Sequence, residues 1–474
     1  MYAAHYPRPR HATGEEDSPA TEQHRRLKED VFDPPHPRPL PSGRGNSDSP
    51  PLSAITNTHN VMLRPNILFL LIDCLRADAL FGTTRGSQTP TLDRLVQAGV
   101  SCTQAVSSAS STTPCVASLL TGTYSFVHGI RSIFGLKLNP TVPTLVETLR
   151  TAGYHTLAEV SGPLFPETGL DRGFDQYHFR EGAAYLSTTW GADLRQRLQG
   201  AEFHAPWFLF LHLWELHHHR HILPTFSTRT HGRNRYERAL SSLDSELATL
   251  IAALPPNTLI VIHGDHGERV VKTDFQYRLY RLSRDLLGRT TMKREGHEMD
   301  ISEDLIRVPL VFTSANGNGH PSLRPGAHVS QLVRQVDALP TLLDLAGAPV
   351  PPTVHGRSLV PALQQDTPLG IEAYLEAFLR IRSDPRDRRV GWRTEKWKYI
   401  YAPQNPQLGE ELYHLPADPR ERQNMASRQP DVVAMLRQRI EAIQHGPIAP
   451  NPGQVMTPEE QAQIEKRLIE LGYM

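Results

Sequence analysis

An unbroken apolar segment is the feature that most constrains how this chain can fold. Residues 67–72 read ILFLLI, and Asp73 follows them directly. The segment is too short for a typical helix, and its apolar residues do not alternate with polar ones. Strands that are buried on both faces of a parallel sheet have this pattern. We therefore predict a buried parallel strand that ends at a carboxylate.

Similar segments recur further along the chain and are separated by helical patterns. Thr89 and Pro90 suit the N-cap and first position of a helix, and Gly99 suits its end. Strands are expected at residues 207–213, 259–262 and 308–312, and further helices at 143–152, 238–254 and 337–346. This alternation predicts an α/β fold with a doubly wound, mostly parallel sheet.

The pattern changes after residue 350. Shorter apolar runs at residues 374–379, 389–392, 397–401 and 412–413 indicate a small antiparallel sheet. A capping box at residues 457–460 begins a terminal helix. We therefore predict a catalytic α/β domain over residues 64–350. A C-terminal subdomain over 351–474 would hold the small sheet and the terminal helix.

Residues 1–60 differ in composition from the rest of the chain. They hold ten of its 40 prolines, interspersed with Arg, Ser, Gly and His. Such a segment cannot bury enough apolar surface to offset its ordering entropy. We predict a disordered Pro-rich tail, with a partner-binding arm as the alternative.

The composition limits the classes of partner. The chain has 50 Lys and Arg against 50 Asp and Glu, so any anionic substrate must be bound by a local site, and nucleic acid is not expected. Its three cysteines form no CxxC pair, which excludes a structural zinc site built on thiolates and fits a reducing compartment. We find no apolar leader segment and no run near the roughly 18 apolar residues of a membrane span. The expected location is cytoplasmic, without membrane contact.

Two strand ends carry acidic residues. Asp73 ends the first predicted strand, and residues 263–268, HGDHGE, follow another. Both groups would lie at the carboxyl ends of parallel strands, where ligand crevices form. Asp and His supply the ligands that Zn²⁺, Mn²⁺ and Mg²⁺ use. A single Asp after a strand can also be a turn former or helix cap, an explanation that fits the second cluster less well.

A hydroxyl-rich segment offers a nucleophile. Residues 107–113 read SSASSTT and lead into an apolar helical pattern with Pro114 near its first turn. A helix N-terminus binds anions, and a hydroxyl beside it can act as a nucleophile. Taken alone, such a segment is also compatible with an ordinary loop.

Several motifs in order resemble the sulfatase family of the alkaline phosphatase superfamily over residues 64–474. They include Pro65-Asn66-Ile67 leading to Asp73, TPTLDRL at 89–95, PCVASLLTG at 114–122 and GDHGE at 264–268. The similarity continues at residues 308–311, 337–347, 356–359, 411–413, 418–419 and 471–473. It implies an alkaline phosphatase-like fold.

The resemblance also implies roles for individual residues. Asp73, Asp265 and His266 would hold a divalent metal ion (Mn, Zn, Mg or Ca), with an oxygen of Thr112 as a further ligand. Thr112 stands at the position of the family's nucleophile.

Two histidines match family residues that touch substrate. His217 and His297 would either bind a second metal or hydrogen-bond the substrate and protonate its leaving group. Lys293 and Thr113 are further candidate substrate contacts, although Lys293 could equally be a solvated loop residue.

The chain departs from the pattern of true sulfatases. Their core reads Cys or Ser, any residue, Pro, any residue, Arg, and the first residue becomes formylglycine; residues 112–116 here read TTPCV. Threonine cannot form formylglycine, the Arg is missing, and Cys115 lies three positions too late. The usual Gly-Lys-Trp-His is replaced at residues 162–165 by GPLF, and the usual Asp-Asp pair by Asp73-Cys74.

These departures favour phosphorus chemistry. A sulfate ester of threonine has no easy exit, whereas a phosphothreonine can be attacked in line by water or an acceptor alcohol. We expect a metal-dependent hydrolase or transferase of small anionic phosphodiester or phosphonate-type esters, acting through a covalent Thr112 intermediate. The alternatives are a sulfatase without formylglycine and a degenerate binding protein. The sequence does not indicate an oligomeric state.

Overall fold

The computed structural model describes residues 64–182, 184–200, 202–217, 220–270, 297, 300–315, 323–378, 385–451 and 453–471. The predicted tail, residues 1–60, lies outside these ranges. Residues 62–474 form one compact unit.

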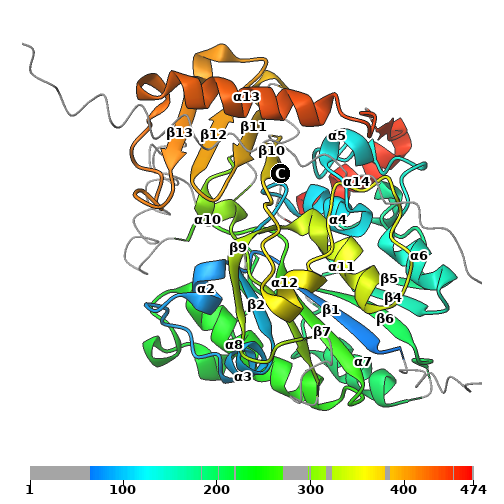
Figure 1. Cartoon of the computed structure of the whole chain (residues 1–474). Coiled ribbons are helices and arrows are strands. Elements are labelled where there is room, and N and C mark those ends of the chain that lie inside the picture. Colours follow the sequence, from blue (N-terminus) through cyan, green and yellow to red (C-terminus); the bar gives the residue numbers. More distant parts are fainter. Residues whose placement is uncertain are drawn as a thin grey trace, which may run out of the picture. The chain divides into compact units, whose positions relative to one another are not determined.

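The described residues build one large sheet of eight strands in the order β5-β4-β6-β1-β7-β8-β2-β9 (Figure 1). Its strands are β1 (Asn66–Ile72), β2 (Val100–Val106), β4 (His155–Val160), β5 (Gln176–Phe179), β6 (Trp207–Leu213), β7 (Thr258–Gly264), β8 (Leu310–Ser314) and β9 (His328–Arg334). All neighbouring strands are parallel except β8, which runs antiparallel to β7 and β2. The predicted mostly parallel α/β sheet is therefore confirmed.

Strand β1 is central and buried on both faces, as its sequence predicts. Ile67, Phe69 and Leu71 belong to one apolar core, and the alternating residues Leu68 and Leu70 belong to another. Because helices cover both faces of the sheet, each side chain of β1 is shielded from water. The first core includes residues of helices α4 (Thr112–Thr121), α6 (Leu145–Thr151) and α11 (Ala338–Leu345), and the second includes residues of α3 (Pro90–Ala98), α7 (Thr189–Gln199) and α8 (Arg235–Ala252).

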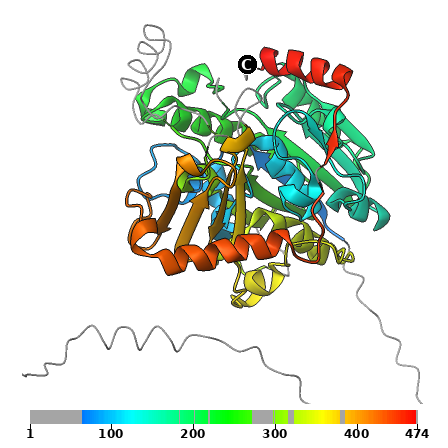
Figure 2. The same ribbon diagram turned by 90° about the horizontal axis from the view of Figure 1, so that it is seen from above.

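The predicted small sheet is present as β10 (Ala373–Ala377), β11 (Arg389–Arg393), β12 (Trp397–Tyr401) and β13 (Glu410–His414), all antiparallel. Helix α13 (Pro430–Gln444) lies across it (Figure 2) and buries Val433, Leu436 and Ile440 in a shared apolar cluster. Arg393 and Lys398 of this sheet pair with Glu303 of the α/β domain at 3.0 and 3.3 Å.

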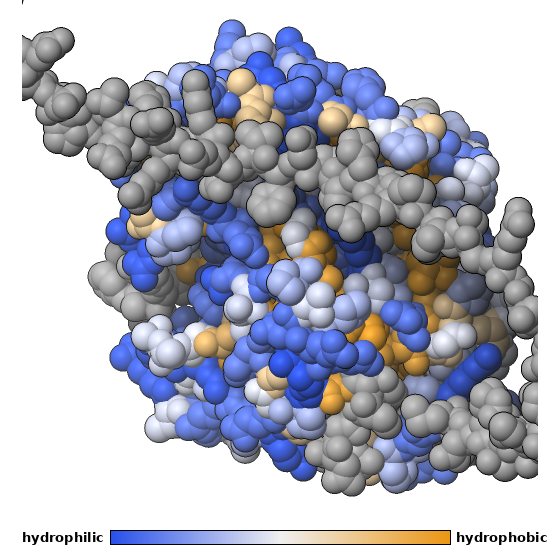
Figure 3. Space-filling model, in the orientation of Figure 1, coloured by the Kyte–Doolittle hydropathy of each residue, from blue (hydrophilic) through white to orange (hydrophobic). Residues whose placement is uncertain are grey.

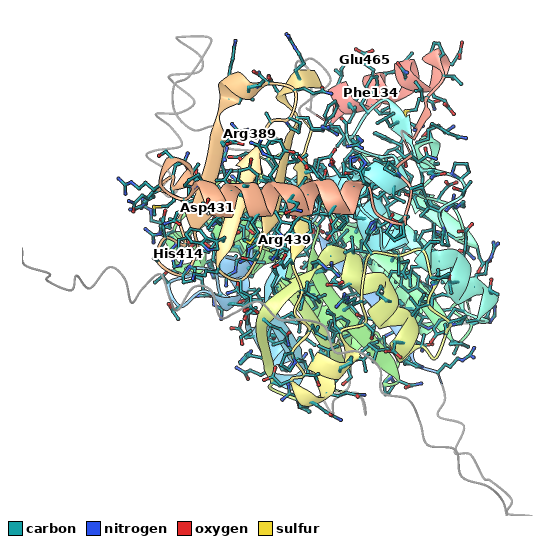
Figure 4. The ribbon with its side chains drawn as sticks, turned by 45° about the horizontal axis from the view of Figure 1, so that its top comes forward. Phe134, Arg389, His414, Asp431, Arg439 and Glu465 are labelled. Carbon is teal, nitrogen blue, oxygen red and sulfur yellow. The ribbon has the colours of Figure 1, made fainter. Side chains whose placement is uncertain are left out.

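The terminal helix α14 (Pro458–Glu470) begins at the predicted capping box, where Thr457 and Glu460 cap each other. Its apolar residues Ile464 and Leu468 pack with Phe165 and Trp214, which follow strands β4 and β6. Figure 4 shows Phe134, a partly buried neighbour of this cluster, beside α14. The helix therefore packs on the α/β domain.

Shorter α-helices and strands are also present in the described fold. They are α2 (Ala77–Phe81), α5 (Ser125–His128), β3 (Leu136–Lys137), α10 (Glu303–Ile306), α12 (Val360–Gln365) and β14 (Gln454–Val455). The face shown in Figure 3 is largely hydrophilic, with apolar residues in patches between polar ones. Within the described ranges, none of the helices combines the length and apolarity that a membrane crossing requires.

Candidate active site

The site lies at the carboxyl ends of the central strands. Ile72 of β1 is in register with Gly264 of β7, so Asp73 and Asp265 leave the sheet side by side. Both are fully buried, and oxygens of these two carboxylates and a ring nitrogen of His266 all lie within 4.8 Å of one another. The sequence-predicted pair of acidic strand ends therefore forms one cluster.

Thr112 joins this cluster from the first position of α4. Its Oγ1 lies 3.1 Å from Asp73 Oδ2, to which it donates, and 3.2 Å from His266 Nε2. The structure thus brings together the four residues for which the resemblance implies metal binding.

Short backbone contacts orient the cluster. His266 Nδ1 lies 2.8 Å from the Gly267 carbonyl oxygen, which leaves Nε2 facing Thr112. Asp265 Oδ1 accepts hydrogen bonds from the backbone N–H groups of Cys74 and His266 at 3.0 and 2.8 Å. These bonds leave Asp265 Oδ2 pointing to the rest of the cluster.

The cluster fits a divalent cation. Among the described residues, Asp73 Oδ1 and Asp265 Oδ2 are buried and accept no hydrogen bond. Buried carboxylate oxygens without a partner are costly, and a cation between them would remove that cost. Burial and the charge of Asp73 raise the pKa of Asp265. Burial opposes ionisation of Asp73 too, but the contact with His212 at 3.4 Å and the other imidazoles around the carboxylate hold its pKa well below its usual range.

Sequence reasoning assigned no role to two polar residues beside the carboxylates. His212 on β6 is fully buried, and its Nε2 lies 3.4 Å from Asp73 Oδ2. Gln335 donates to the Asp265 carbonyl oxygen at 3.0 Å and accepts from the backbone N–H of Ser108 at 3.3 Å. The sequence did contain one indication of a role for His212, because it is the one polar residue within the apolar run of β6.

The two predicted substrate histidines both reach the site. The ring of His217 stacks on Trp214 at 3.8 Å, and the ring of His297 lies 4.3 Å from His266 and 5.3 Å from His217. Burial lowers the pKa of His217 to about 3. Burial opposes ionisation of Glu268, but its contact with His297 lowers the pKa of this carboxyl to about 2.

The other predicted residues are placed differently. The Thr113 hydroxyl donates to the Pro163 carbonyl oxygen at 2.9 Å, so its proton is already engaged within the protein. Cys115 is buried and donates to the Ala109 carbonyl oxygen at 3.2 Å, as a structural cysteine would. Lys293 lies outside the described residues.

Solved structures similar to this chain include hydrolases of two kinds. The chain superposes on a phosphonate monoester hydrolase of Agrobacterium radiobacter with a TM-score of 0.62 at 20% identity, covering 80% of this chain and 95% of the other. A 2-O GAG sulfatase superposes with a TM-score of 0.60 at 19% identity, covering 80% and 91%. These likenesses confirm the alkaline phosphatase-like fold.

Sequence comparisons identify the family. Arylsulfatase K of Canis lupus familiaris is 26% identical over 223 residues, which are 44% of this chain and 36% of the relative. The chain thus matches about a third of the length of this curated relative. The family model for the N-sulphoglucosamine sulphohydrolase C-terminal region matches residues 300–446. The family model for sulfatases matches residues 65–348, so the chain belongs to the sulfatase family.

Proposed function

We propose that this chain hydrolyses small phosphodiesters or phosphonate monoesters through a covalent intermediate on Thr112. The observation that carries the proposal is the position of the Thr112 hydroxyl, 3.1 Å from Asp73 Oδ2 and 3.2 Å from His266 Nε2. Similar structures include a phosphonate monoester hydrolase and a sulfatase, so they support ester hydrolysis without choosing between the two esters.

The choice of phosphorus rests on the nucleophile. Threonine carries no second hydroxyl on its reacting carbon, so a sulfate group placed on it could not be expelled from the side chain. A phosphoryl group on threonine can be removed by in-line attack of water on phosphorus.

Asp73, Asp265, His266 and the Thr112 oxygen would hold a divalent metal. Such an ion lowers the pKa of a ligating hydroxyl and neutralises the charge on the ester oxygens. Thr112 Oγ1 would attack phosphorus and release its hydroxyl proton to solvent, while the bond from phosphorus to the leaving oxygen breaks and that oxygen takes up a proton. In the second half, water would attack phosphorus and release a proton, while the bond to Thr112 Oγ1 breaks and that oxygen takes up a proton to restore the hydroxyl.

The remaining residues position these groups. Asp73 Oδ2 accepts the hydrogen bond of the Thr112 hydroxyl and orients it, while His212 lies against the same carboxylate oxygen. Because burial keeps His217 neutral, it can hold an ester oxygen through a ring N–H without adding charge. The ring of His297 lies 5.3 Å from that of His217, and His297 is the candidate for protonating the leaving oxygen.

The test uses the full chain loaded in turn with Mn²⁺, Zn²⁺, Mg²⁺ and Ca²⁺. We expect bis(p-nitrophenyl) phosphate or a phenyl phosphonate ester to be hydrolysed faster than p-nitrophenyl sulfate. Thr112→Ala should lower kcat by about a thousandfold or more, because it removes the attacking atom. Cys115→Ala, in the same helix, should keep its turnover. Mass spectrometry after a rapid quench should find phosphate on Thr112.

Sulfate ester hydrolysis is the second candidate, because the curated relatives are named arylsulfatases. Faster turnover of the aryl sulfate than of both phosphorus esters would favour it and overturn the first proposal. Full turnover by Thr112→Ala would remove Thr112 as the nucleophile for either substrate.

A further inference from the structure

A second group of metal-ligating side chains lies beside the first. Cys74, Glu268 and His297 offer a thiol, a carboxylate and an imidazole, which are the three ligand types that zinc sites use. Cys74 Sγ is 3.7 Å from Glu268 Oε2 and 3.8 Å from His297 Nδ1, and that nitrogen is 3.5 Å from the same carboxylate oxygen. The three atoms therefore form a nearly equilateral triangle.

The size of this triangle suits a metal ion. Tetrahedral zinc, with a sulfur at about 2.3 Å and nitrogen or oxygen at about 2.0 to 2.1 Å, separates its ligand atoms by roughly 3.3 to 3.6 Å. The observed separations are longer by only a few tenths of an ångström. As hydrogen bonds, the two contacts of the sulfur are long and weak.

The cluster is buried, and the backbone of Cys74 is anchored by a hydrogen bond. Cys74 and Glu268 are 0% and 2% exposed, and the His297 side chain is 7% exposed. The Cys74 carbonyl oxygen accepts a hydrogen bond from Tyr236 at 2.9 Å. Within the described part of the chain, the second carboxylate oxygen, Glu268 Oε1, is buried without a hydrogen bond, so it is free to bind a cation as well.

His266 separates the two groups of ligands. A ring nitrogen of His266 lies within 4.8 Å of Cys74 and His297 as well as of Asp73 and Asp265. Its Nδ1 is held by the Gly267 carbonyl oxygen, and its Nε2 lies 3.2 Å from Thr112 Oγ1. His266 can therefore bind a metal together with Asp73 and Asp265. Cys74, Glu268 and His297 remain available to bind a second ion.

We propose that Cys74, Glu268 and His297 form a second metal site, selective for a thiophilic divalent cation such as Zn²⁺. Three protein ligands leave one coordination position for another group, as in catalytic zinc sites. The site itself rests on the geometry above. Only its use, as the second half of a two-metal clamp on the ester, rests on the proposed function.

Cobalt is the first probe, because a thiolate bound to Co²⁺ gives a charge-transfer band in the near ultraviolet. We expect the chelator-treated full chain to show this band when loaded with Co²⁺ alone. Cys74→Ser should abolish the band, and Cys102→Ser, at a buried cysteine on β2, should keep it. A band that persists in Cys74→Ser, or its absence from the folded wild-type chain, would overturn the proposal.

Zinc counting is the second probe. After loading with Zn²⁺ and gel filtration, the wild type should carry two ions per chain, and Cys74→Ser and His297→Ala one each. His297→Ala leaves the central strands unchanged, so it tests the site even if Cys74→Ser does not fold. A zinc content that is the same in the wild type and in both folded variants would overturn the second site, whatever the occupancy of the first.

Failure of this proposal and failure of the proposed function give different results. Thr112→Ala should lose turnover and still show the cobalt–sulfur band, because Thr112 is not a ligand of the second site. A chain with the band and no esterase activity would keep the second site and reject the proposed function. A chain with Thr112-dependent turnover and no band would support the proposed function and reject the second metal site.

Discussion

At the scale of single residues, a glycine sets the position of a substrate histidine. Gly162 has φ +68°, and a Cβ built on it would lie 2.2 Å from the Trp214 ring. The same ring stacks on His217, at 3.8 Å between ring centres. The missing side chain at residue 162 thus leaves the space in which Trp214 supports His217.

Gly162→Ala should displace Trp214. Left-handed backbone strain costs about 1 to 2 kcal/mol and overpacking about 1 to 3 kcal/mol, so we expect a loss of roughly 3 kcal/mol in the free energy of unfolding, measured with urea. Turnover should fall as well, because His217 loses its support. Gly347→Ala is the matched control, since Gly347 has φ +65° and nothing within 4 Å of a built Cβ. Equal losses in the two variants would show that the contact with Trp214 is unimportant.

The sequence indicates the parts of the site that follow strands. Asp73, Asp265 and His266 come directly after long apolar runs, so their meeting at one sheet edge is predictable. The prediction for Thr112 rests mainly on the family resemblance, because a hydroxyl-rich segment alone is compatible with an ordinary loop. His212 is missed because one His inside an apolar strand has the pattern of a core residue.

The second cluster could not be predicted in the same way. Cys74, Glu268 and His297 are separated by 194 and 29 positions, and no spacing pattern links them. Only the packing of the chain shows that the sulfur, the carboxylate and the ring nitrogen lie within 3.8 Å of one another.

At the scale of elements, a buried histidine joins α5 to the nucleophile helix α4. His128 at the end of α5 is fully buried, and its Nε2 lies 3.0 Å from Ser118 Oγ on α4. Its Nδ1 accepts the backbone N–H of Ile130 at 3.2 Å, so the proton lies on Nε2 and the ring is neutral. Burial, together with the charge of Arg131, lowers the pKa of His128 to about 3.

This arrangement predicts a loss of stability in acid. The unfolded chain protonates His128 below about pH 6.5 and the folded chain does not, so stability falls as the pH is lowered from 6.5 towards 3. Between pH 7 and 5 the contribution of His128 is about 2 kcal/mol. His128→Gln does not titrate, so its free energy of unfolding in urea should fall by about 2 kcal/mol less than that of the wild type over this range. His204→Gln, at an exposed position, is the control, and a parallel decline of all three proteins would contradict the prediction.

The strands of the large sheet that the sequence predicts correctly are those with an uninterrupted apolar pattern. Strands β1, β6 and β7 are buried along their whole length, and their sequences show it. Strands β2 and β9 contain polar residues, including Thr103, Gln104 and Gln331, and were not predicted. The predicted strand at residues 308–312 begins two residues before β8, which spans Leu310–Ser314. The antiparallel direction of β8 follows only from its pairing with β7 and β2.

At the scale of the whole molecule, the fold concentrates negative charge at one point. Strands β1 and β7 are adjacent, and so they bring Asp73 and Asp265 together where both are fully buried. Each carboxylate makes the ionisation of the other less favourable, and burial adds to this cost. The stability of the folded chain should therefore depend on a cation that neutralises the pair.

Metal removal tests this dependence. At a metal concentration of a hundred times Kd, binding stabilises the folded state by about 2.7 kcal/mol, so chelator treatment should lower the free energy of unfolding in urea by that amount. Asp265→Asn removes one charge but keeps an oxygen to accept the backbone N–H groups of Cys74 and His266. This variant should be at least as stable as the chelated wild type and should gain less from added metal. If chelation leaves the wild-type free energy of unfolding unchanged, the fold tolerates the two buried carboxylates without a cation, and the metal acts in the reaction alone.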